Sequence, residues 1–199
     1  AGAGPAADPR AGVGLLVLSA LGAFGLGAFE VGLSLQSQQT WRLSPGDLGW
    51  LFVVCSLVML AIQVLLFDRL RKRLQPARLV IGGFVLMAAG FAFMASTSAY
   101  GVIMGLVAMI AMGSGVLLPT LSVAMVDRAG PAAGSAAGYQ NAAGNLGQAV
   151  GSAVVGLLFI AVPHGSFTVV AFAMGAAAVG AWILARLRGA LAAERGPNT

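Results

Sequence analysis

The chain has 199 residues, of which 59% are hydrophobic and 9% are charged, and its mean hydropathy is +0.93. Because a soluble domain carries about 25% charged residues, this chain cannot cover a water-facing surface, and the composition predicts a membrane protein. The formal net charge of +5 would suit a nucleic-acid partner, but the positions of the basic residues argue against one. The single cysteine, Cys55, excludes an intrachain disulfide.

Residues 1–12, AGAGPAADPRAG, read as a cytoplasmic linker, without the basic start or cleavage site of a signal peptide. Such a start is typical of an interior cut in a longer chain. Six apolar stretches follow, each close to the roughly 20 residues that cross about 30 Å of hydrocarbon. Because lipid offers no hydrogen bonds to bare backbone, each is predicted to be a helix. The predicted spans are 13–35, 48–67, 79–95, 100–125, 136–162 and 167–187, with a cytoplasmic tail over 188–199.

The first span carries one carboxylate, Glu30, on the same helical face as Ser19, Ser34 and Ser37. A carboxylate within a span costs a few kcal/mol on insertion scales. Glu30 could take up and release protons as a cavity changes sides, as a proton antiporter requires, or it could bind a cationic substrate. Alternatively, it lies hydrated near the outer end of the span and faces Arg42.

The loop after the second span, VLLFDRLRKRLQP, closes the span with an acid, followed by a basic cluster. It resembles the cytoplasmic signature of the major facilitator superfamily, Gly-x-x-x-Asp-Arg-x-Gly-Arg/Lys-Arg/Lys. The matching residues are Asp68, Arg69, Lys72 and Arg73, while Val64 and Arg71 replace the two glycines. The resemblance implies a gating loop in which Asp68 pairs with a basic residue or caps a neighbouring helix. The alternative is a plain basic loop that sets the topology.

Residues 113–159 resemble the tenth and eleventh helices of the same family, with a Gly-rich span, a central proline, a short loop and repeated glycines. Pro119 lies well inside its span and is expected to kink it. Gly147 and Gly151 form a small-xxx-small pair that lets helix backbones approach closely. Gly144 lies on the same strip.

Three amides and one serine form a stripe along the fifth span, which we call the amide stripe. Its residues are spaced i, i+4, i+7 and i+11: Asn141, Asn145, Gln148 and Ser152. In lipid such a stripe must face protein or water, since an unpaired polar group costs several kcal/mol. It could line a substrate cavity or make hydrogen bonds between helices. The same two interpretations apply to Gln63 in the second span.

The basic residues predict the topology. If the first helix starts in the cytoplasm, ten of the 11 basic residues lie in segments 1–12, 68–78, 126–135 and 186–199, and only Arg42 lies outside. This satisfies the positive-inside rule and explains the basic charge without nucleic acid. Both termini are then cytoplasmic, and the basic segments could also meet anionic lipid headgroups.

The resemblance, which covers 13–187, implies an all-α half of a facilitator transporter, built from inverted three-helix repeats 13–95 and 100–187. Its motifs are most similar to those of the carboxy-terminal half. The missing partner would be an amino-terminal six-helix half or a second copy of this chain. Such a pair would move a small solute by alternating access, as drug and metabolite exporters of the bacterial inner membrane do, with a proton or other ion as the coupled species.

Other function classes find less support. The sequence shows no zinc-binding set, no Ser-His-Asp arrangement and no phosphate-binding loop, so we expect neither an enzyme nor a cofactor. Two alternatives stay open: a six-span scaffold or assembly domain that does not transport, and a half-size transporter that acts as a homodimer.

Overall fold

The computed structural model describes residues 9–162 and 165–194, with side chains described over 12–162 and 165–187. Within these ranges every regular element is helical, which confirms the predicted all-α class. The elements in chain order are α1 (Pro9–Gln39), α2 (Pro45–Ala61), the π-helix η1 (Ile62–Leu66), α3 (Phe67–Arg73), α4 (Pro76–Met94), α5 (Tyr100–Ala129), the 3-10 helix η2 (Gly130–Ala132), α6 (Ala133–Ala161) and α7 (Ser166–Glu194).

Local sequence sets the ends of two helices. α2 begins at Pro45 behind a reciprocal cap: the Asp47 N–H donates to Ser44 Oγ (3.1 Å), and the Ser44 N–H donates to the Asp47 carboxylate (3.2 Å). α5 ends where Gly130 adopts a φ of +50°, a conformation that glycine reaches without a steric penalty. The short loop predicted between spans 100–125 and 136–162 is therefore only the single turn η2.

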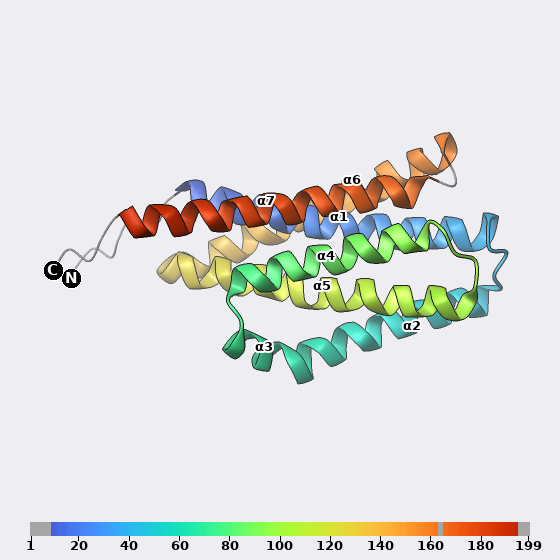
Figure 1. The fold of residues 1–199 in the computed structure, drawn as a ribbon, viewed down its shortest axis with the longest axis horizontal. Helices are drawn as coiled ribbons and strands as arrows, with labels where there is room; N and C mark the ends of the chain where they lie inside the picture. The colour runs from blue at the N-terminus through green and yellow to red at the C-terminus, as the bar shows by residue number, and fades with distance from the viewer. Residues whose placement is uncertain (1–8, 163–164, 195–199) are drawn as a thin grey trace.

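Five segments are long and apolar enough to cross a membrane, where the sequence predicts six. The difference arises because α5, η2 and α6 follow one another without a gap and count as one segment of 62 residues. That is about three times the roughly 20 residues that one crossing needs, and Figure 1 shows α5 and α6 running in opposite directions along the bundle. The five segments are Gly12–Gln39, Pro45–Arg73, Pro76–Met94, Tyr100–Ala161 and Ser166–Leu187.

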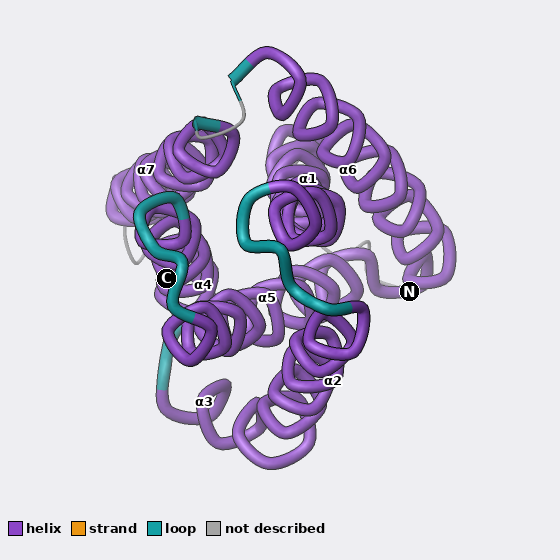
Figure 2. Tube along the Cα trace, turned by 90° about the vertical axis from the view of Figure 1, so that its right-hand side faces the viewer, coloured by secondary structure: helices purple, strands orange, loops and turns teal. Residues whose placement is uncertain are grey.

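The helices pass back and forth along one elongated bundle (Figure 1). α6 lies along α1, α4 packs between α5 and α7, and α2 packs mainly on α5 (Figure 2). The segment that contains α2, Pro45–Arg73, is consequently the most exposed of the five: 11% of its most apolar part is buried, against 50% for Gly12–Gln39. In a membrane this exposed surface must face lipid or another bundle.

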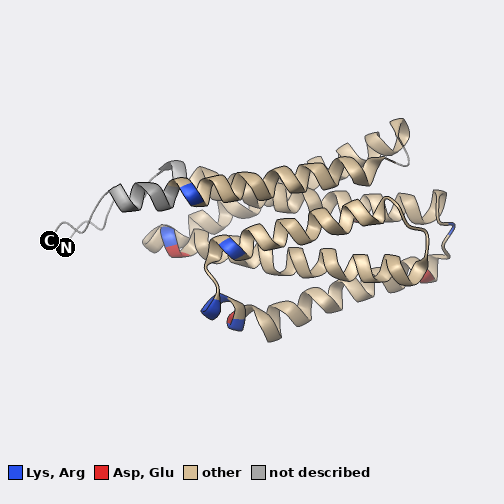
Figure 3. Cartoon of the chain, in the orientation of Figure 1, with Lys and Arg blue, Asp and Glu red and all other residues tan. Residues whose placement is uncertain are grey.

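The two ends of the bundle differ in composition. Aromatic side chains close the end opposite α3, where Trp41 stacks on Phe167 with 6.5 Å between ring centroids. There Trp41 Nε1 donates to the Thr97 carbonyl (3.0 Å), and the Tyr100 hydroxyl donates to the Asp47 carbonyl (3.1 Å). Basic residues gather instead at the end that holds α3 (Figure 3). This asymmetry in charge is the one on which the predicted topology depends.

Candidate functional site

Glycines bring the backbones of α1 and α6 into direct contact along a line that we call the glycine seam (Gly27, Gly147 and Gly151). A Cβ atom added at Gly147 would collide with the Ala20 carbonyl oxygen, and one at Gly151 would collide with that of Phe24. A Cβ atom at Gly27 would collide with the Gln148 carbonyl oxygen. Only glycine fits at these positions, and such close approach is the usual basis of helix association in lipid.

Polar side chains bond across the same pair of helices at three levels. Gln148 Nε2 donates to the Glu30 carboxylate (3.0 Å), Ser152 Oγ donates to the Gly27 carbonyl (3.3 Å), and Gln140 Nε2 lies 3.4 Å from Ser19 Oγ. Pairing of this kind is what a polar group in an apolar interior requires. Glu30 is therefore bonded to α6 and is partly buried.

A cavity of about 450 Å³ lies beside the glycine seam, bounded by α1, α5, α6 and η1. We call it the amide cavity, because five of its lining side chains are amides. The lining residues are Ser19, Ala23, Leu26, Gln63, Leu118, Pro119, Ser122, Val123, Gln140, Asn141, Gly144, Asn145 and Gln148. Apolar walls with a few amide donors and acceptors suit a small amphipathic solute.

The predicted amide stripe divides between two surroundings. Asn141 and Asn145 are exposed side chains that line the cavity, whereas Gln148 reaches across the seam to Glu30. Asn141, Asn145 and Gln63 make no hydrogen bond within the described part of the chain. These three amides are thus free to bind a solute, water or another bundle.

Glu30 and Ser34 do not line the cavity themselves. Glu30 lies one hydrogen bond behind the wall, through Gln148, and Ser34 offers its carbonyl to the Ser37 hydroxyl (2.8 Å). Gln140, which is not among the residues predicted from the sequence, is buried and lines the cavity. A signal for it was present, because Gln140 is spaced i, i+4 and i+8 with Gly144 and Gln148 on one side of the helix.

The wall across from the glycine seam departs from regular α-helical geometry. The π-helix η1 carries Gln63, and Pro119 lies inside α5 and lines the cavity. Pro119 has no N–H to donate to the preceding turn, and π-turns and prolines are the usual places where helices bend.

On α6, Gly144 also lines the cavity, with open space around it. A Cβ atom added at Gly144 would meet only Ala23, at 3.9 Å.

The basic loop contacts the bundle through a residue that the family signature does not include. Arg71, which stands where the signature has glycine, pairs with Asp127 at the end of α5 (3.1 Å). Arg69 donates to the Leu65 carbonyl in its own chain segment (2.8 Å), and Asp68 has no partner among the described residues. Asp68, Arg69, Lys72 and Arg73 are all exposed.

No group of three His, Cys, Asp or Glu side chains within the described ranges could hold a metal ion. The arrangement offers amide donors and acceptors to a small solute, and it holds the Glu30 carboxylate one hydrogen bond behind the cavity wall, through Gln148.

Residues 15–198 match the model of the Major Facilitator Superfamily. The chain is 31% identical over 157 residues to "Multidrug resistance protein 2" of Bacillus subtilis (strain 168), a match that covers 76% of this chain and 38% of that relative. The chain therefore spans well under half the length of the curated relative that it matches. Its helical bundle, its apolar segments and this family match agree: the chain is an integral membrane protein that belongs to the Major Facilitator Superfamily.

Proposed function

We propose that this chain is one half of a secondary transporter that exports small amphipathic solutes. The observation that carries the proposal is the amide cavity, in which the side chains of Gln63, Asn141 and Asn145 have no partner within the described chain. In hydrocarbon each unpaired amide costs several kcal/mol. These side chains must therefore face water, a solute or a second bundle, as the surface of a transport pathway does.

The proposed topology has six crossings. α5 has 30 residues and α6 has 29, so each is long enough to cross a bilayer by itself. Residues 13–95 and 100–187 would form the inverted repeats, with the basic α3 end in the cytoplasm together with both termini. The match to a protein of Bacillus subtilis favours a bacterial plasma membrane.

The second wall of the pathway would come from another six-helix bundle. Because this chain matches 38% of its relative, the remaining length is sufficient for an amino-terminal half. A second copy of this chain is the other possible source. The two bundles would rock about a solute near the midplane and expose it to each side in turn. Since the relative's printed name refers to multidrug resistance, we propose drug-like solutes as the substrate class.

Glu30 is the proposed proton site. Its carboxylate accepts the hydrogen bond from Gln148, which itself lines the cavity. Protonation would remove the charge to which Gln148 donates and so would change the donors that Gln148 presents to a solute. This contact links proton uptake to substrate binding without requiring the two to touch.

The test is Glu30→Gln in the full-length transporter, reconstituted in liposomes with an imposed pH gradient. We expect proton-driven export to be lost and drug binding to become independent of pH, because the neutral amide mimics the protonated carboxyl group. Insertion and thermal stability should be kept, because the amide preserves the shape and a hydrogen bond. Glu30→Asp is the matched control and should retain part of the activity. Export by Glu30→Gln at the wild-type rate and with the wild-type pH dependence would refute the proposal.

A further inference from the structure

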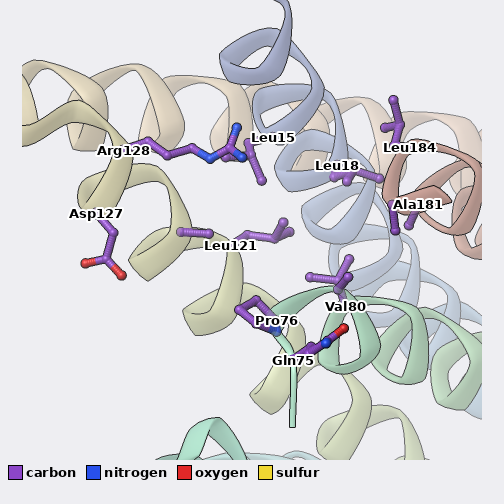
Figure 4. A pocket seen from close by; sticks show the side chains of 13 residues that line it. Leu15, Leu18, Gln75, Pro76, Val80, Leu121, Asp127, Arg128, Ala181 and Leu184 are labelled. Atoms are coloured by element: carbon purple, nitrogen blue, oxygen red, sulfur yellow. The ribbon is translucent and has the colours of Figure 1, made fainter. Parts of the chain in front are cut away.

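A second cavity lies at the α3 end of the bundle, between α1, α4, α5 and α7 (Figure 4). It measures about 400 Å³ and shares no lining residue with the amide cavity. We call it the end pocket. The lining residues are Leu15, Leu18, Gln75, Pro76, Ala77, Val80, Leu121, Ala124, Asp127, Arg128, Ala181, Leu184 and Ala185.

Ten of the 13 residues that line the end pocket are apolar. Leu15, Leu18, Val80, Leu121 and Ala181 are all buried in the bundle although they line the pocket. Water packed against these five side chains would lack the polar partners that buried water needs. An apolar occupant suits this part of the pocket, and in a membrane the abundant apolar molecule is the acyl chain of a lipid.

The mouth of the end pocket is basic. In Figure 4 the guanidinium group of Arg128 lies beside Leu15, whereas the Asp127 carboxylate points away from the pocket. Asp127 is occupied by its ion pair with Arg71 (3.1 Å). Arg128 has no hydrogen bond or ion pair within the described part of the chain. The mouth therefore offers a free guanidinium group, which binds phosphate oxygens well.

The apolar lining and the Arg128 guanidinium group belong to the same pocket. A single molecule with an apolar chain and an anionic group can contact both. We infer that the end pocket binds an anionic glycerophospholipid, with one acyl chain between α1, α4, α5 and α7 and the phosphate at Arg128. Basic pockets between spans on the cytoplasmic side are a recognised setting for anionic headgroups. The inference depends on the membrane placement of this end and is independent of any role of the amide cavity.

The test measures lipid retention and thermal stability of the full-length transporter in detergent, with phosphatidylglycerol or with phosphatidylcholine of the same acyl chains. We expect phosphatidylglycerol to be retained in native mass spectra and to raise the Tm more than phosphatidylcholine does. Arg128→Gln should lose at least tenfold in affinity for phosphatidylglycerol. Arg73→Gln, which removes an equal charge from exposed α3, is the matched control and should bind as the wild type does.

A second variant, Ala181→Phe, fills the pocket from α7 and should abolish retention while the circular dichroism spectrum stays helical. Equal losses in Arg128→Gln and Arg73→Gln would overturn the inference, because they would show a general charge effect. Equal retention of the two lipids would also overturn it. Stabilisation by inorganic phosphate alone, to the same Tm as the lipid, would show a free-anion site instead.

Discussion

The two walls of the amide cavity are built in opposite ways. On one side α1 and α6 are regular helices in backbone contact along the glycine seam, with hydrogen bonds at three levels. On the other side α2 passes into a π-helix at η1, and α5 contains Pro119. Where these two helices meet, a Cβ at Gly115 would touch α2 and η1 only at ordinary distances of 3.4 to 3.5 Å.

The two walls are therefore expected to behave differently: one stays rigid and the other bends. The glycine seam fixes α1 against α6, so Glu30 and Gln148 keep their contact. The opposite wall has the two features that let helices bend, and it carries Gln63. If the cavity changes shape during transport, the change is expected in α2 and α5, while the wall that holds the carboxylate moves as a unit.

The largest expected effect comes from breaking the seam. Gly147→Leu places a side chain where even a Cβ collides with the Ala20 carbonyl, so α1 and α6 must separate. Overpacking costs about 3 kcal/mol or more when backbone has to move, which corresponds to a fall in Tm of roughly 6–12 °C for a chain of this size. Thermal unfolding of the variant and the wild type in detergent measures this fall in Tm.

Gly138→Leu is the control for this substitution. It lies on the same helix, and nothing stands within 4 Å of an added Cβ. Its Tm should stay within about 2 °C of the wild-type value, because an exposed substitution usually changes stability by no more than about 0.5 kcal/mol. Similar losses in both variants would show that the seam is not what holds the two helices together.

A smaller effect is expected from straightening the opposite wall. Pro119→Ala restores an N–H that can donate to the carbonyl of Gly115, four residues earlier, and it removes the ring that disfavours a straight helix. The Tm should be unchanged or slightly higher, because alanine is a better helix former than proline, while the export rate falls several-fold. An unchanged export rate would mean that α5 does not need to bend.

Much of the fold could be predicted from the sequence, because length and apolarity alone decide where helices lie in lipid. The junction of α5 and α6 could not, since the polar stretch around Gly130 reads as a loop and the chain reverses there within one helical turn. The π-helix η1 was also missed. Its residues, Ile62–Leu66, contain no glycine or proline to mark it, and its position depends on how α2 packs against α5.

For the candidate site, helical spacing groups residues on one side of α6, but a face of about 100° can span both a helix contact and a cavity. Gln148 therefore both lines the cavity and donates to Glu30 on α1, while Asn145 lines the open space without a hydrogen bond to α1. The contact of Arg71 with Asp127 joins residues 56 positions apart, a separation that no local pattern reveals.

The most direct test of the central claim is the water accessibility of the amide cavity in the intact membrane. On a Cys55→Ser background, Asn145→Cys should react quickly with a hydrophilic maleimide, and a transported dye should slow the reaction. Leu146→Cys, at the same depth on α6, is 67% exposed but outside the cavity lining, and it should react far more slowly. Equal rates at the two positions, with no protection by the dye, would contradict the account.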